Sequence, residues 1–163
     1  MSDSSAIPTS LDPETIEPRH GTTAYPPPFR AVCEGRAKRA LGSVFALTQF
    51  GVNMTELAPG AATAQRHWHE REDEFVFILD GTATLVTDAG ETELAAGTCA
   101  GFPAGRADGH MIVNRGTTPV RLLEIGSRAA EEVGHYPDID LRMEKRDGAM
   151  RFTSKDGTPY AGE

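Results

Sequence analysis

From about Leu41 onward, apolar residues occur in short runs that are separated by turn residues. The turns contain glycine at Pro59-Gly60, Asp80-Gly81 and Ala96-Gly97. This spacing is typical of an all-β sandwich or barrel, and it leaves little sequence for helices. The runs that we expect to form strands are 43–50, 52–57, 63–69, 75–79, 82–87, 92–94, 111–113 and 120–125.

Both ends of the chain have a different pattern. The first 28 residues hold six of the 11 prolines, so this segment cannot form a continuous helix or a central strand. Near the other end, Asp147-Gly148 separates two alternating segments and predicts a hairpin. We therefore divide the chain into an N-terminal arm (1–40), a barrel (41–128) and a C-terminal hairpin extension packed on the barrel (129–163).

Composition and charge narrow the functional classes. The chain has 163 residues, which fits one domain, and 16 basic against 24 acidic residues give a net charge of -8. This charge argues against nucleic acid as a partner. No apolar run approaches the roughly 20 residues of a membrane span, and the first residues lack the pattern of a secretory signal. We expect a cytoplasmic protein without membrane contact, with Cys33 and Cys99 as reduced thiols.

The candidate chemistry lies in His67-Trp68-His69. Side chains alternate across a strand, so the two histidines share one face and Trp68 points away from it. If residues 70–73 form a hairpin loop, His69 lies opposite Glu74 and His67 lies opposite Val76. Two exposed histidines without a ligand role are the alternative, but Glu74 on the same face favours a metal site.

His110 could complete this site from another strand. Three imidazoles and one carboxylate suit a single divalent Zn, Ni, Fe, Mn, Co or Cu ion better than Ca or Mg. Six-coordination would leave two positions for a small-molecule substrate. No catalytic base is identifiable. The candidate pocket residues share a face with the ligands or could meet an anion, and they are Val76, Ile78, Ile112, Asn114 and Arg121.

These residues form two motifs that resemble those of cupins. The first motif is Gly60, His67, His69, Glu74 and Gly81, and the second is Gly97, Pro103, Gly105, His110 and Asn114. The spacer from Gly60 to His67 has six residues where the cupin pattern has five, and the spacer from Gly105 to His110 has four where it has two. The resemblance implies a double-stranded β-helix, or jelly-roll barrel, with His67, His69, Glu74 and His110 as metal ligands.

The resemblance leaves the reaction open. The flanking sequences resemble a bacterial group of small single-domain cupins, some of which have been called sugar-phosphate isomerases. The first hypothesis is therefore a metal-dependent isomerase acting on a small polar oxygenated substrate such as a sugar or sugar phosphate. Two or more basic groups near the barrel mouth would favour it. The alternatives are a dioxygenase with Fe or Mn held by three histidines and a glutamate, and a non-catalytic small-molecule-binding cupin.

A homodimer is also expected. Single-domain cupins commonly pair their barrels through sheet edges, and an exposed edge strand is a liability until it is covered.

Overall fold

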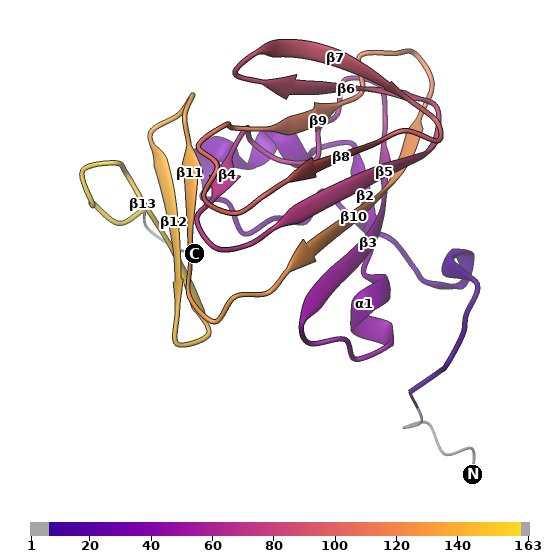
Figure 1. Cartoon of the computed structure of the whole chain (residues 1–163), viewed down its shortest axis with the longest axis horizontal. Coiled ribbons are helices and arrows are strands. Elements are labelled where there is room, and N and C mark those ends of the chain that lie inside the picture. The colour runs from indigo at the N-terminus through magenta and orange to yellow at the C-terminus, as the bar shows by residue number, and fades with distance from the viewer. Residues whose placement is uncertain (1–6, 161–163) are drawn as a thin grey trace.

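The computed structural model describes residues 7–160 and arranges them as three antiparallel β-sheets (Figure 1). The sequence prediction of an all-β, double-stranded β-helix fold is confirmed. The described helices are short: η1 (Pro13–Thr15), η2 (Pro27–Cys33) and α1 (Leu41–Val44). None of them has the length and apolar character needed to cross a membrane.

The largest sheet has six strands. Its order is β1 (Arg19–His20), β2 (Arg36–Arg39), β3 (Phe50–Leu57), β10 (Val120–Ser127), β5 (Glu74–Asp80) and β8 (Cys99–Phe102). Leu57, Ile78 and Leu122 on its three central strands are completely buried. The inner face of β3, β10 and β5 therefore forms one wall of the barrel.

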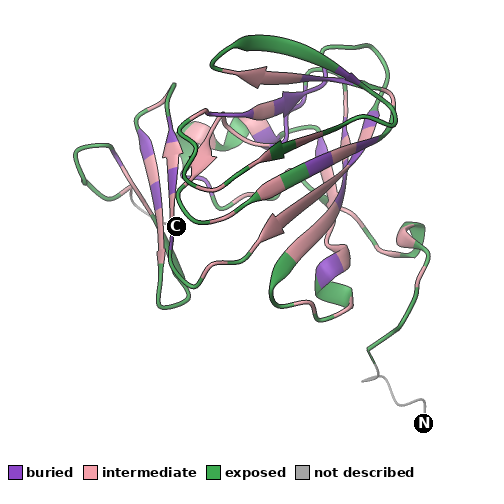
Figure 2. Cartoon of the chain, in the orientation of Figure 1, coloured by how far each residue is buried: buried purple, intermediate pink, exposed green. Residues whose placement is uncertain are grey.

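The opposite wall is a three-stranded sheet. Its order is β7 (Gly90–Ala95), β6 (Thr82–Thr87) and β9 (Met111–Val113). Ala83, Leu94 and Ile112 from this sheet belong to the same hydrophobic cluster as Leu57 and Ile78 of the larger sheet. The core therefore lies between the two sheets. Figure 2 shows that β7 is mostly exposed, and Leu94 is its one buried residue.

A third sheet joins the C-terminal region to the barrel. Its order is β13 (Ala149–Thr153), β12 (Leu141–Arg146), β11 (Glu132–Tyr136) and β4 (Trp68–His69). Tyr136 and Leu141 pack against Tyr25 and Cys33 of the N-terminal segment, so this sheet has its own small core. The C-terminal region thus contributes three strands, and β11 lies directly beside the strand that carries His69.

Several local expectations from the sequence are confirmed. Strands β6 and β9 occupy residues 82–87 and 111–113 as expected. Asp147 and Gly148 connect β12 to β13 as the expected hairpin turn, with φ of 52° and 75°. Positive φ at both turn residues is the geometry for which Asp-Gly is favoured.

Other local expectations are wrong. Residues 43–49 do not form a strand, because α1 ends at Val44 and a turn with φ of 52° at Ala46 follows it, so β3 begins only at Phe50. Gly42 allows the close approach, since a Cβ there would lie 2.9 Å from the Val52 nitrogen. Strand β2, within the expected arm, pairs with β3 and belongs to the barrel sheet. The first six and last three residues of the expected segments lie outside the described residues.

Candidate metal centre

Four candidate ligands meet at one end of the barrel, and they come from different sheets. His69 lies in β4 and Glu74 is the first residue of β5. His67 precedes β4 and forms a β-bridge with His110, which directly precedes β9. Two backbone hydrogen bonds hold this bridge. The N–H of His67 donates to the carbonyl oxygen of His110 at 3.1 Å, and the N–H of His110 donates to the carbonyl oxygen of His67 at 2.8 Å. The backbone therefore fixes the separation of the first and third histidines.

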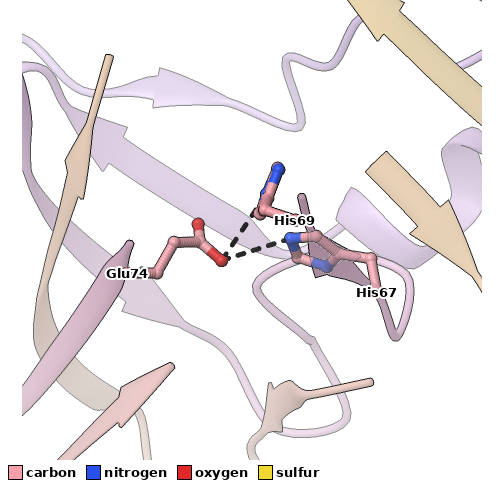
Figure 3. Close-up of side chains that lie close together, drawn as sticks. All are labelled: His67, His69 and Glu74. Atoms are coloured by element: carbon pink, nitrogen blue, oxygen red, sulfur yellow. Dashed lines mark ion pairs between the residues drawn. The ribbon is translucent and has the colours of Figure 1, made fainter. Parts of the chain in front are cut away.

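The three imidazoles converge on one carboxylate oxygen, Oε2 of Glu74. The Nε2 atoms of His67, His69 and His110 lie 3.4, 3.6 and 2.7 Å from it. Figure 3 shows His67 and His69 pointing toward this oxygen from one side. The ligand atoms of His67, His69 and Glu74 all lie within 4.8 Å of one another. Three of the four predicted ligands are thus grouped in space, and His110 joins them through its contact with Glu74.

Neighbouring groups hold the rings of His67 and His110. The Nδ1–H of His67 donates to the carbonyl oxygen of Gln65 at 2.7 Å, which leaves the lone pair on Nε2. Tyr136 stacks on His67 with ring centroids 5.8 Å apart. Phe102 stacks on His110 at 3.6 Å with nearly parallel planes. Both rings are therefore oriented by contacts that do not use Nε2.

His69 is held differently, beside a buried carboxylate. Its Nδ1 lies 3.8 Å from Oε1 of Glu132, whose side chain is completely buried. Glu132 itself accepts hydrogen bonds from the backbone N–H groups of Glu70, Arg71 and Val133 at 2.8, 3.0 and 2.7 Å. Nδ1 of His69 is buried without a hydrogen-bond partner within residues 7–160. Glu132 is thus fixed by the backbone next to the ring nitrogen that faces away from the cluster.

The expected hairpin between the histidines and Glu74 is wrong. Strand β4 pairs with β11, with His69 opposite Gly134, whereas β5 pairs with β10 and β8. Trp68 points away from the cluster as expected and stacks on His135 at 4.1 Å. The histidines and Glu74 meet because two different sheets approach each other, not because their strands are paired.

The cluster opens into a cavity of about 390 Å³ in the barrel. Among the expected pocket residues, Val76 and Ile112 line this cavity beside His67, Glu74 and His110. Four basic side chains also line it: Arg36, Lys38, Arg128 and Lys145.

Three expected pocket residues lie elsewhere. Ile78 is completely buried in the hydrophobic core. Asn114 is buried in a turn, where its amide donates to the carbonyl oxygens of Leu57 and Thr118. Arg121 pairs with Glu14 of the N-terminal segment, because its neighbour on β10, Leu122, is the residue that points into the core.

Sequence reasoning missed the four basic side chains of the cavity and two carboxylates at or near the site. Glu124 on β10 and Lys38 on β2 line the cavity and form an ion pair with an N–O distance of 3.1 Å. Glu132 lies behind His69. Alternation along residues 120–125 could have placed Glu124 on the inner face with Leu122, but no local signal identifies its partner, 86 positions away in the chain.

Burial and the central carboxylate set the protonation of the cluster. Burial raises the pKa of Glu74, but hydrogen bonds with His110 and His67 outweigh it and hold this pKa well below its usual value. Burial lowers the pKa of His69 to about 4, and it also lowers that of His110. For His67, burial is outweighed by the hydrogen bond and charge of Glu74 and by the Gln65 carbonyl, so the pKa is raised above 6.5.

These shifts predict how metal affinity depends on pH. Protons compete with a metal for neutral imidazole, and His67 is the first ligand to become protonated as the pH falls. We expect affinity for Zn²⁺ or Ni²⁺ to decrease by about tenfold per pH unit below the raised pKa of His67, because one proton must be released. Titration calorimetry at pH 8, 7 and 6 measures this. An affinity that is constant over that range would contradict it.

The donor set fits a divalent transition metal. Nitrogen and oxygen ligands about 2.1 Å from a metal lie roughly 3.0 Å apart at octahedral angles and roughly 3.4 Å apart at tetrahedral angles. The distances of 2.7, 3.4 and 3.6 Å from the imidazoles to Glu74 Oε2 bracket these values. His67, His69 and Glu74 could therefore hold one ion, since their ligand atoms all lie within 4.8 Å of one another. His110 contacts Glu74 but lies outside this group, so it would have to move toward the other two imidazoles to become the fourth ligand.

Comparison with known proteins shows which family has this architecture. Residues 53–126 match the cupin domain family. A solved structure of a cupin-superfamily sugar phosphate isomerase from Silicibacter pomeroyi is 40% identical, with a TM-score of 0.88 over 94% of this chain and 97% of that one. The chain belongs to the cupin superfamily.

Other cupin-like structures are more distant. A putative sugar phosphate isomerase from Acidithiobacillus ferrooxidans is 29% identical, with a TM-score of 0.70 over 78% of this cupin and 81% of that chain. The polyketide cyclase RemF from Streptomyces resistomycificus, at 20% identity and a TM-score of 0.60 over 72% of this chain and 78% of its own, shares the fold. Among proteins with curated functions, none is similar enough in sequence to match.

Proposed function

We propose that this cupin is a metal-dependent isomerase that acts on a small anionic, oxygenated substrate, of which a sugar phosphate is the best candidate. His67, His69, Glu74 and His110 would hold one divalent ion. When bound, such an ion polarises substrate oxygens and so makes a neighbouring C–H more acidic. The 40%-identical protein from S. pomeroyi is described as a sugar phosphate isomerase, which supports the substrate class.

The observation that carries the proposal is the combination of this cluster with basic groups in one cavity. Lys38, Arg128 and Lys145 line the same cavity as His67 and Glu74. Lys38 and Lys145 have carboxylate partners, Glu124 and Glu72, each at 3.1 Å. Arg128 donates one N–H to the carbonyl oxygen of Leu47 at 2.9 Å. Basic groups near the cavity favour an isomerase of phosphorylated sugars because they attract an anionic substrate.

The proposal is tested with the metal-loaded protein and a panel of aldose and ketose phosphates of three to six carbons. We expect interconversion of at least one aldose–ketose pair, followed by NMR, and its loss when a chelator removes the metal. The His67→Ala, His69→Ala double variant, which lacks two of the candidate ligands, serves as the control with impaired metal binding.

Absence of turnover over the whole panel would contradict the isomerase. Oxygen uptake with Fe or Mn would instead favour the dioxygenase. Binding of a panel member without turnover would favour the non-catalytic cupin. The homodimer and the cytoplasmic location stay predictions.

A further inference from the structure

Glu124 lies on the inner face of the barrel, on the strand next to the one that carries Glu74. On the neighbouring strands, Gly126 of β10 pairs with Glu74 of β5, and Glu124 pairs with Val76. Glu124 and Glu74 are therefore diagonal neighbours on one face, a relation that places Cβ atoms roughly 7–8 Å apart. A substrate of a few carbon atoms held at the cluster would reach Glu124.

The sheet leaves space at this position. Gly126 pairs with Gly51 on its other side, so two adjacent strands carry no side chain beside Glu74. Both glycines line the cavity together with Glu124. The Glu124 side chain is 20% exposed and that of Lys38 is 26% exposed. This carboxylate and this ammonium group thus face the open part of the cavity and are not enclosed in the core.

The contacts of Glu124 are concentrated on one of its oxygens. Lys38 Nζ lies 3.1 Å from Oε2, and the Thr55 hydroxyl donates to the same atom. Oε1 takes part in neither contact. The carboxylate is thus held in place by two groups and keeps a second oxygen for other partners. Two acid–base pairs outside the candidate ligand set line the cavity, Glu124 with Lys38 and Glu72 with Lys145, and Glu124 is the carboxylate that lies diagonal to Glu74 on the barrel wall.

We propose that Glu124 is the catalytic base of the isomerisation and that Lys38 transfers the second proton, between the two substrate oxygens. This inference rests on the proposed function and adds the residues that move protons. Glu124 would act on the carbon-bound hydrogen next to the carbonyl group of an α-hydroxy aldehyde or ketone. Lys38 would contact the carbonyl oxygen and the adjacent hydroxyl.

The proton transfers balance without a further reactant. The Glu124 carboxylate takes the proton from C2, the C–H electron pair forms the C1–C2 double bond, and the carbonyl electrons move to O1. The Lys38 ammonium donates a proton to O1, which gives an enediol. Lys38 then takes the proton from the O2 hydroxyl, the C2 carbonyl forms, and Glu124 returns its proton to C1. Both side chains end in their starting states.

The test follows hydrogen exchange and isomerisation in D₂O with metal-loaded protein and the same panel of sugar phosphates. We expect Glu124→Gln to slow exchange of the carbon-bound hydrogen by about 100-fold or more, the usual effect of removing a positioned base. Its metal content should equal that of wild type, since Glu124 is not a ligand. Glu124→Asp should recover part of the rate because it restores a carboxylate.

Glu56→Gln is the matched control. Glu56 lies on β3 next to Thr55 and therefore faces the other side of the sheet. Exchange as fast in Glu124→Gln as in Glu56→Gln would overturn the assignment of the base while leaving the isomerase intact. A wild-type protein without exchange or turnover on any panel member would overturn the proposed function and this inference together.

Lys38→Met separates the role of the lysine. If Lys38 carries the proton between oxygens, this variant should lose more isomerisation than exchange, because Glu124 can still remove the carbon-bound hydrogen. The ratio of exchange to isomerisation should therefore increase. An unchanged ratio would remove Lys38 from the proposed pair.

Discussion

Replacing His67 and His69 together by alanine is expected to reduce bound metal from about one ion per chain to trace amounts, with an affinity loss of roughly 1,000-fold or more. The change removes two of the three imidazoles whose Nε2 atoms surround Oε2 of Glu74. The remaining Glu74 and His110 would form only a two-donor site. Elemental analysis of protein purified without chelators measures the effect.

His20→Ala is the control for loss of a histidine as such. His20 is an exposed residue in β1, at the edge of the six-stranded sheet. We expect this variant to retain the wild-type metal content. If the double variant and His20→Ala carried equal amounts of metal, the four-residue centre would be wrong.

Glu132→Ala is expected to lower the free energy of unfolding by about 2–5 kcal/mol, because backbone donors lose a charged acceptor. The backbone N–H groups of Glu70, Arg71 and Val133 all donate to this carboxylate, and its side chain is completely buried. Removing it takes this acceptor from the N–H groups of Arg71 and Val133, at about 1–3 kcal/mol for each donor that water does not reach, whereas Glu70 keeps a bond to the carbonyl oxygen of Val133 at 3.1 Å. Chemical denaturation of the metal-free protein measures the loss.

Two variants separate this effect from a general loss of charge. Glu132→Gln keeps an acceptor oxygen and should lose less stability than Glu132→Ala. Glu131→Ala removes the neighbouring carboxylate, which is half-exposed and pairs with Arg71 at 3.1 Å, and should change stability by no more than about 0.5 kcal/mol. Equal stability of the Glu131 and Glu132 alanine variants would show that the buried network contributes little.

Glu132→Ala should also lower the affinity for metal. Oε1 of Glu132 lies 3.8 Å from Nδ1 of His69, on the side of the ring opposite the cluster. Carboxylates hydrogen-bonded to a ligating imidazole orient it, and their loss typically lowers metal affinity by about 10–100-fold. Glu132 lies too far from Nδ1 for a hydrogen bond in this structure, so we expect an effect at or below the lower end of that range. Glu132 is therefore expected to contribute both to the stability of the fold and to metal binding at the candidate centre.

Much of the site could be predicted from local sequence. Alternation placed His67 and His69 on one face, and the spacing to Glu74 and His110 matched the cupin motifs. These features depend on positions a few residues apart, or on a motif that contains them. The Asp147-Gly148 turn was predictable for the same reason, because its conformation depends on the two residues themselves.

The features that could not be predicted from the sequence depend on contacts between distant segments. Strand β4 has two residues, too few to show its partner, and it pairs with β11 more than 60 positions later. Glu132 follows Glu131 in a polar segment that reads as surface, yet its partners lie at Glu70 and Arg71. The burial of a charged side chain is decided by donors that only the folded chain brings near it.

The three sheets meet at the candidate centre, and this has a thermodynamic consequence. His69 belongs to the four-stranded sheet, Glu74 belongs to the six-stranded sheet, and His110 adjoins β9 of the three-stranded sheet. An ion held by all of them would act as a cross-link, so local opening of any one sheet would require its release. At a free metal concentration 1,000 times the dissociation constant, this linkage adds about 4 kcal/mol to stability. Metal supply would then set how long the chain survives unfolding and proteolysis, independently of any reaction in the cavity.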